Sequence, residues 1–263
     1  MRWNTPNDPF TNRRPMMKRL APLALAGLLA APAHALDVTT MSDAEREAFR
    51  AEVREYLMEN PEVIMEAVAV LEERQAAAQE NADLSLVKAH EEAIFDDGFS
   101  WVGGNPEGDV TVVEFLDYRC GYCRKAFEEV QQLIERDGNI RFIVKEFPIL
   151  GEASLASSRF AIATRQVAGD DAYAAMHDAL MAYKGSTEPA ALSRLARTLG
   201  IAPEPIVAHL DDPAVDAEIR KTRELAQRLQ ISGTPTFVMG DQMIRGYVPL
   251  RAMEDIVGAQ RDG

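Results

Sequence analysis

Cysteine is scarce in this chain of 263 residues, which contains only Cys120 and Cys123. Two cysteines are too few for a disulfide framework or for a four-cysteine zinc site. Positive charge is also in short supply, since 28 Lys and Arg stand against 42 Asp and Glu, for a formal net charge of −14. Such an acidic chain is poorly suited to nucleic acid or to an anionic membrane surface. We therefore expect no nucleic-acid partner, and we expect the two cysteines to act together.

Long hydrophobic runs are absent except near the N-terminus. Residues 16–35 contain the basic pair Lys18-Arg19, a short apolar run over 20–31 and small residues ending in Ala35. This order is typical of a secretory signal peptide, and the run is shorter than the ~20 apolar residues of a transmembrane anchor. The sequence predicts a leader over 1–35 that is cleaved after Ala35. The mature protein is then expected outside the cytosol, where thiols can be oxidised.

A helical arm is predicted over residues 36–92. Ser42 and Glu45 form a capping-box pattern at the start of a first helix, which ends at about Glu59, and Asn60-Pro61 is expected to cap and open a second helix. The apolar residues at helical spacing are Phe49, Val53, Leu57, Ile64, Val68 and Leu71. Such a stripe has to be buried on the chain's own domain or against another copy, and the pattern leaves both open.

The main domain is predicted over residues 93–263. A glycine-rich turn signal at 103–106 precedes an apolar, β-branched strand. The expected elements are a strand over 110–116, a helix beginning at the cysteines, a strand over 140–147, helices over 152–230, a hairpin over 235–245 and a last helix from 250. The first strand, helix and second strand form a βαβ unit with parallel strands. This order indicates an α/β, thioredoxin-like fold with an inserted helical subdomain.

Cys120-Gly121-Tyr122-Cys123 lies where the first strand passes into a helix. Unpaired N–H groups and the helix dipole stabilise a thiolate there, so Cys120 is the expected exposed nucleophile. Cys123, one turn into the helix, is expected to be more buried and to resolve the mixed disulfide. A c-type haem site would need His at position 124, which is Arg, and a zinc site would need two more ligands. A purely structural disulfide would close so short a loop that it would add little stability.

Thr234-Pro235 stands at the start of a strand that should lie inside the sheet. Proline is normally excluded from that position. It is tolerated if the peptide bond is cis, which would turn the Thr234 backbone toward the cysteines and let it pair with an extended client peptide. His90, His177 and His209 stand alone on helical segments, and we assign them no function.

Three stretches carry a resemblance to a known family: residues 113–123, residues 145–151 and residues 233–237. They are similar to the DsbA family of periplasmic thiol:disulfide oxidoreductases, over about residues 93–260. The arm around residues 56–67 resembles DsbA-like proteins akin to suppressor-of-copper-sensitivity protein C, some of which are trimeric isomerases. Two departures stand out. Gly121-Tyr122 replaces the Pro-His of strongly oxidising members, which argues against a very oxidising potential, and Thr rather than Val precedes Pro235.

The resemblance implies an enzyme that forms or isomerises disulfides in the periplasm. Its partners would be unfolded or misoxidised secreted proteins, a membrane redox partner and, through the arm, two further copies in a homotrimer. No cofactor and no metal are expected. Glu114, an acid in an apolar strand, matches the family's proton acceptor beneath the buried cysteine. The alternative interpretation is structural, with the carboxylate paired to a neighbour such as Lys145. The alternative function is a copper-handling protein that binds Cu(I) through the reduced pair, although no methionine cluster is visible.

Overall fold

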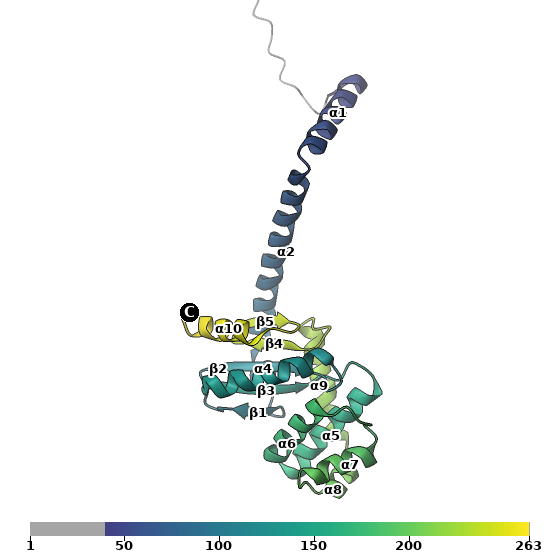
Figure 1. Ribbon diagram of the computed structural model, residues 1–263, viewed down its shortest axis with the longest axis vertical. Coiled ribbons are helices and arrows are strands. Elements are labelled where there is room, and N and C mark those ends of the chain that lie inside the picture. The colour runs from purple at the N-terminus through teal and green to yellow at the C-terminus, as the bar shows by residue number, and fades with distance from the viewer. Residues whose placement is uncertain (1–39, 263) are drawn as a thin grey trace, which may run out of the picture. The chain divides into compact units, whose positions relative to one another are not determined.

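The computed structural model describes residues 40–262, so the predicted leader and its cleavage site lie outside the described part of the chain. Residues 40–262 form ten helices and five strands (Figure 1). In chain order these are α1 (Asp43–Glu59), α2 (Glu62–Ala89), α3 (Glu91–Phe95), β1 (Trp101–Gly104), β2 (Val110–Leu116), α4 (Gly121–Asp137), β3 (Ile140–Glu146), α5 (Glu152–Ala168), α6 (Asp170–Ala182), α7 (Pro189–Thr198), α8 (Pro203–His209), α9 (Pro213–Arg228), β4 (Thr236–Met239), β5 (Gln242–Arg245) and α10 (Leu250–Asp262). The chain divides into two compact units, the first ending at Val63 and the second beginning at Ile64.

Helix α1 begins and ends where the sequence predicts. The Ser42 hydroxyl accepts from the Glu45 N–H, and the Glu45 carboxylate accepts from the Ser42 N–H at 2.8 Å, which confirms the capping box. The predicted N-cap role of Asn60 is wrong. Its side-chain amide donates to the Tyr56 carbonyl at 2.9 Å and closes the end of α1, while α2 starts at Glu62.

Helix α2, nearly all of which belongs to the second unit, is held against the sheet at its C-terminal end. It continues for 28 residues, through the polar stretch after Leu71. Near its end Val87 is 3% exposed, and the buried Asp83 carboxylate accepts from the Arg245 guanidinium of β5 at 2.6 Å. This ion pair and the apolar contact of Val87 therefore hold the last turns of α2 against the sheet.

The five strands form one sheet in the order β1-β3-β2-β4-β5 (Figure 1). β2 and β3 are parallel and joined by α4, so the predicted βαβ unit is confirmed, and so is the β4–β5 hairpin with its Gly240-Asp241 turn. β1 is a strand that we did not predict, because Gly103 and Gly104 read as a turn. It pairs with β3 through its backbone, and glycines in a strand leave no side-chain pattern to recognise.

Side chains of β2 alternate between two buried layers. Val112 and Leu116 belong to the layer formed with α4, α10 and the helices that follow β3, whereas Val113 and Phe115 face α3 and the end of α9. Helix α9 contributes to both layers, since its first half packs against α5 and its second half covers the sheet. The helical stretch after β3 is therefore continuous with the packing of the sheet.

One edge of the sheet collects three loops. The C-terminal ends of parallel β2 and β3 lie side by side, and antiparallel β4 starts at the same edge. The loops over residues 117–120, 147–151 and 231–235 therefore meet there. Within residues 40–262, no helix is both long enough and apolar enough to cross a membrane.

Candidate active site

The two cysteines lie at the N-terminus of α4, where the sequence places them. Cys120 is the N-cap residue, with an extended backbone (φ −73°, ψ 121°), and its carbonyl accepts the first helical hydrogen bond from the Arg124 N–H at 3.1 Å. Both thiols are free. Cys123 is fully buried and Cys120 is 7% exposed, so Cys120 is the more accessible of the two but far less exposed than the sequence led us to expect.

The surroundings of Cys120 favour its thiolate. The thiol of Cys123 hydrogen-bonds to the Cys120 sulfur and, with the Thr234 side chain and backbone N–H groups of the first helical turn, lowers the pKa of Cys120 to about 5 despite its burial. These donors act where the N–H groups of a helix have no partners of their own. Cys120 is therefore ionised at neutral pH.

The surroundings of Cys123 favour its thiol. The hydrogen bond that Cys123 donates to Cys120, its burial and the nearby carboxylate of Glu114 together raise the pKa of Cys123 well above the usual thiol value. Desolvation and a neighbouring negative charge both disfavour a second thiolate. The pair is thus divided into one ionised sulfur and one protonated sulfur.

The loop before β4 lies against Cys120. The Thr234–Pro235 peptide bond is cis, as the sequence predicts, and β4 begins immediately after it at Thr236. The Cys120 sulfur lies 3.2 Å from the Thr234 carbonyl oxygen, to which it can donate only when the thiol is protonated. The structure therefore brings together residues 114 positions apart in the chain.

The dipeptide between the cysteines lies on the surface. Gly121 is exposed, and the ring of Tyr122 is 64% exposed and lies 6.4 Å from the ring of Tyr247. Neither side chain of the dipeptide can supply the positive charge that a histidine would bring to a thiolate. The low pKa of Cys120 rests on Cys123, Thr234 and the helix N-terminus instead.

Glu114 lies on the same face of β2 as the layer that contains Cys123. It is 2% exposed, and within residues 40–262 its Oε1 has no hydrogen-bond partner. Burial, helped by the nearby Cys120, raises its pKa to about 8. The alternative pairing with Lys145 is wrong. Lys145 aligns with Phe115 in the sheet and therefore points to the opposite face, where its Nζ binds the Asp97 carboxylate at 2.5 Å.

Asp117 joins two of the three loops, a role that we did not predict. Its Oδ1 accepts from the Arg119 N–H at 2.8 Å, and its Oδ2 accepts from the N–H groups of Ile149 and Leu150 at 2.8 and 3.0 Å. The side chain is fully buried. An acid directly after an apolar strand and just before the cysteines was the signal that could have revealed it.

We expect Thr234→Val to raise the pKa of Cys120 above its value of about 5. Valine has nearly the same shape but no hydroxyl, so the thiolate loses one of its hydrogen-bond donors. The pH dependence of iodoacetamide labelling of Cys120 measures the change. Thr236→Val is a suitable control, because the Thr236 hydroxyl donates to the Gly233 carbonyl. A pKa unchanged by Thr234→Val would contradict the role of the hydroxyl.

We expect Glu114→Gln to stabilise the reduced protein increasingly as the pH rises from 5 to 9. The pKa of Glu114 is raised in the folded state, so folding favours its protonated form, and this contribution is lost as the pH rises through about 8. A raised pKa of this size corresponds to several kcal/mol at high pH. Urea unfolding of both proteins at each pH measures the difference, and a difference independent of pH would contradict the burial of the charge.

Comparisons with known proteins agree with this geometry. A family model described as DSBA-like thioredoxin domain matches residues 111–258, and one described as copper resistance protein ScsC N-terminal domain matches residues 45–78. A thioredoxin-like oxidoreductase from Silicibacter pomeroyi is 42% identical, with a TM-score of 0.61 over 65% of this chain and 98% of that structure. Proteus mirabilis ScsC in a compact conformation is 28% identical, with a TM-score of 0.61 over 82% of this chain and 97% of that structure.

Curated relatives match over shorter stretches. Disulfide bond formation protein D of Bacillus subtilis is 26% identical over 61% of this chain and 76% of its own length. Na(+)/H(+) antiporter NhaA 1 of Salinispora arenicola is 32% identical over 59% of this chain, but the match spans only 24% of that longer protein. The chain belongs to the family of DsbA-like thioredoxin-domain proteins, the thiol-disulfide oxidoreductases.

Proposed function

We propose that this protein exchanges disulfides with secreted client proteins through the Cys120–Cys123 pair, forming or isomerising their disulfides. The observation that carries the proposal is the division of the pair. Cys120 is a thiolate at a helix N-terminus beside the Thr234–Pro235 loop, and Cys123 is a buried thiol behind it. That arrangement supplies one attacking sulfur and one resolving sulfur.

In the oxidising direction, a client thiolate attacks the Cys120 sulfur of the Cys120–Cys123 disulfide. The S–S bond breaks, Cys123 leaves with the electron pair, and a mixed disulfide joins Cys120 to the client. A second client thiolate then attacks the client sulfur, and Cys120 leaves as a thiolate, for which its low pKa suits it. The client is oxidised by two electrons and the enzyme pair is reduced by two.

Isomerisation starts from the reduced pair. The Cys120 thiolate attacks a wrong client disulfide and releases a client thiolate, which attacks another client disulfide until Cys120 is displaced. No electrons are transferred overall. When the client stalls, Cys123 loses its proton and attacks the Cys120 sulfur of the mixed disulfide, which releases the client as a thiolate. The proposed role of Glu114 is to accept the Cys123 proton in its ionised form. Its side chain lies near both sulfur atoms, and in the mixed disulfide Cys120 carries no negative charge, so one of the two causes that raise the pKa of Glu114 is absent.

The proposed site of action is the periplasm, which the leader pattern and the family support. One similar structure is that of a periplasmic thioredoxin-like protein from Salmonella enterica serovar Typhimurium, 25% identical to this chain. The clients would be unfolded or misoxidised secreted proteins, and a membrane redox partner would restore the redox state of the cysteine pair. The need for a redox partner follows from the chemistry, since each turnover of an oxidase leaves a reduced cysteine pair that has to be oxidised again.

Two assays test this function. Oxidised protein is mixed with a reduced, unfolded client that has several cysteines, and reduced protein is mixed with a scrambled client, each followed by recovery of the client's native activity. Thiol trapping in cells then separates the two activities, because an oxidase is held oxidised and an isomerase reduced. Failure of both assays, with the pair intact, would contradict the proposal.

A copper-handling function is disfavoured by Cys123. Cu(I) binding by two thiolates needs both sulfurs deprotonated, whereas the hydrogen bond that Cys123 donates to Cys120, its burial and the nearby Glu114 keep it protonated in the metal-free protein. Titration of the reduced and the oxidised protein with Cu(I) decides the matter, since tight binding to the reduced form alone would favour copper handling.

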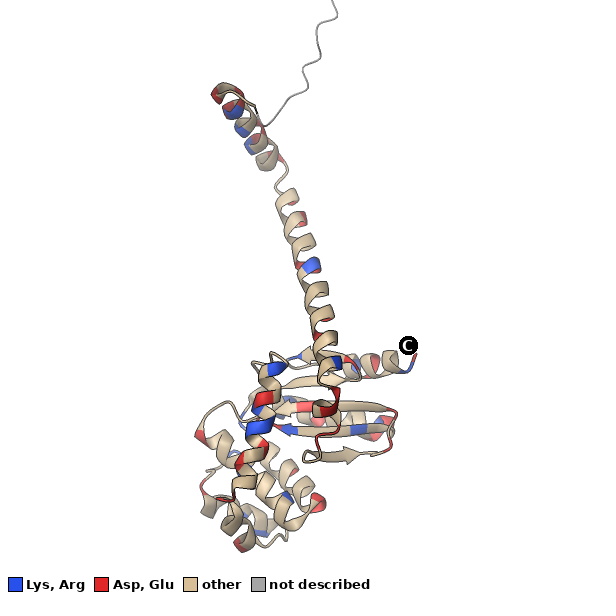
Figure 2. Cartoon of the chain, turned by 180° about the vertical axis from the view of Figure 1, so that it is seen from behind, with Lys and Arg blue, Asp and Glu red and all other residues tan. Residues whose placement is uncertain are grey.

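The arm is the proposed site of self-assembly. Its stripe residues Phe49, Val53, Ile64, Val68 and Leu71 are 40–54% exposed. Full burial of such side chains is worth ~1.5–3 kcal/mol each, so their exposure favours contact with other copies. Figure 2 shows charged residues of both signs along α1, whereas α2 carries fewer charges along its length. A homotrimer, as the resemblance implies, would place several active sites around one client.

We expect deletion of residues 36–80 to convert the assembled protein into a monomer. The deletion removes the stripe but keeps Asp83 and Val87, which anchor α2 to the sheet. The shortened protein should still reduce small disulfides, because its active site is complete, but should lose isomerase activity. Light scattering and the scrambled-client assay measure both effects. A full-length mature protein that is monomeric at micromolar concentration would contradict the assembly.

A further inference from the structure

A buried hydrogen-bond network lies directly behind the nucleophile loop. The Glu146 Oε1 atom accepts from the Tyr118 hydroxyl at 2.7 Å and from the Tyr173 hydroxyl at 2.6 Å. The Tyr118 oxygen lies 3.1 Å from Nδ1 of His177, which donates to it in the tautomer that satisfies both groups. Tyr118, Tyr173 and His177 are at most 1% exposed and Glu146 is 6% exposed. Proton transfer between the cysteines uses none of these side chains.

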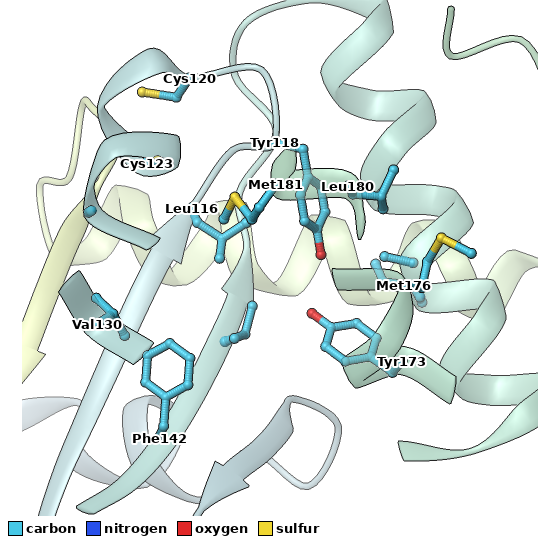
Figure 3. Packing of buried hydrophobic residues seen from close by; sticks show 14 of the residues in the cluster. Leu116, Tyr118, Cys120, Cys123, Val130, Phe142, Tyr173, Met176, Leu180 and Met181 are labelled. Atoms are coloured by element: carbon cyan, nitrogen blue, oxygen red, sulfur yellow. The ribbon is translucent and has the colours of Figure 1, made fainter. Parts of the chain in front are cut away.

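The network joins three parts of the second unit. Glu146 ends β3, Tyr173 and His177 belong to α6, and Tyr118 lies two residues before Cys120. Figure 3 shows the hydroxyl groups of Tyr118 and Tyr173 turned toward each other from opposite sides. The His177 ring stacks on Tyr173 at 6.0 Å and meets the edge of Tyr118 at 5.6 Å. Burial lowers the pKa of His177 to about 4, so the ring is neutral and acts as a packing and donor group.

Tyr118 is held at both of its ends. Its hydroxyl is fixed by Glu146 and His177, and its carbonyl accepts from the Arg124 guanidinium at 2.8 Å. The residue therefore has little freedom to shift along the loop. The Cys120 thiolate depends on short contacts with Thr234 and with N–H groups of the first turn of α4, so a small displacement of this segment would weaken them.

We propose that Glu146 is a positioning residue for the thiol-disulfide reaction, which fixes the Tyr118–Cys120 segment through the Tyr118 hydroxyl and thereby sets the reactivity of Cys120. The proposal rests on the proposed function of Cys120 as the nucleophile. Glu146 itself contacts neither sulfur. It fixes the Tyr118 hydroxyl relative to the end of β3, and Tyr118 belongs to the loop that holds the reacting atom.

A change in the protonation state of Glu146 does not affect a measurement of Cys120 reactivity made near pH 5. Burial raises the pKa of Glu146 to about 7, and Glu218 of α9 and Arg165 of α5 line the same small cavity beside it. At pH 5 the Glu146 carboxyl is therefore neutral. Glutamine at this position is neutral as well and keeps an oxygen that accepts from both tyrosines, whereas leucine has no acceptor.

Two tyrosine variants of the full mature protein form a matched pair. Tyr118→Phe and Tyr173→Phe each remove one O–H donor from the same Glu146 oxygen, but only Tyr118 is connected to Cys120 by the loop. Iodoacetamide labelling of Cys120 is measured against pH for each. We expect Tyr118→Phe to move the midpoint up by about half a pH unit, a roughly threefold loss of thiolate below the midpoint. Tyr173→Phe should leave the midpoint in place.

Glu146 variants complete the test. We expect Glu146→Gln to keep the wild-type midpoint near pH 5 and Glu146→Leu to move it upward with Tyr118→Phe. Equal midpoints for Tyr118→Phe and Tyr173→Phe, whether moved or not, would overturn the positioning role even if Glu146→Leu fails to fold. In the wild-type protein, labelling of Cys123 before Cys120 would instead overturn the proposed function, so the two failures are distinguishable.

Discussion

We expect Cys120→Ser to abolish disulfide exchange, whereas Cys123→Ser should leave the first attack intact and arrest the reaction at mixed disulfides. Cys120 is the thiolate of the pair, because the Cys123 thiol, the Thr234 side chain and the N–H groups of α4 stabilise its negative charge. Serine at position 120 offers no thiolate. Serine at position 123 removes the resolving sulfur but keeps the site otherwise complete.

The measurement is non-reducing electrophoresis of each variant after incubation with a client that carries wrong disulfides. Cys123→Ser should give covalent complexes with the client that a reducing agent separates, and Cys120→Ser should give none. The double variant is the control for contacts that do not involve either sulfur. Cys123 is fully buried and its pKa is raised, so we expect it not to attack a client. Mixed disulfides formed by Cys120→Ser through Cys123 would therefore contradict the assigned roles.

The second large effect concerns the buried ion pair that joins β3 to the segment before β1. The fully buried Lys145 donates to the Asp97 carboxylate at 2.5 Å and to the Ala93 carbonyl at 3.1 Å. Asp97 also accepts from the N–H groups of Phe99 and Ser100. We expect Asp97→Asn to lower the free energy of unfolding by about 3–5 kcal/mol, because a buried ammonium loses its counter-charge.

Urea unfolding at pH 7 measures this loss. Adding Lys145→Met to Asp97→Asn should recover much of it, since an apolar side chain carries no charge to leave unpaired. The exposed pair Arg197–Glu204 provides the control, and Glu204→Gln should cost no more than about 1 kcal/mol. An Asp97→Asn loss as small as that of the control would mean that the buried pair does not hold this part of the sheet.

The elements that the sequence predicts correctly are those with local signals. Ser42 and Glu45 identify the start of α1, the apolar run over 110–116 identifies β2, and Gly240-Asp241 identifies the β4–β5 turn. β1 was not predicted, because its glycines give no strand pattern in the sequence and its pairing with β3 is made by the backbone. Asn60 was assigned to the wrong helix, because an asparagine between two helices can bond to either end.

At the site, the types of residue were predictable, but most of their neighbours were not. Which face a strand residue occupies depends on register, and the register of β2 against β3 sets Glu114 and Lys145 on opposite faces. Glu146 ends β3 directly after Lys145, so no isolated acid in an apolar run marked it, and its tyrosine partners come from distant segments. The approach of the Thr234 backbone to Cys120, by contrast, was predicted, because a cis bond before Pro235 turns that backbone toward the cysteines.

The division of the cysteine pair is most directly tested by labelling the reduced protein with iodoacetamide from pH 3 to pH 10 and locating the label by mass spectrometry. Cys120 should react with a midpoint near pH 5, while Cys123 stays unlabelled at neutral pH because its thiol is buried and its pKa is raised. Equal labelling of the two cysteines across the pH range, or a midpoint of Cys120 near the ordinary thiol value of ~8.5, would contradict the account.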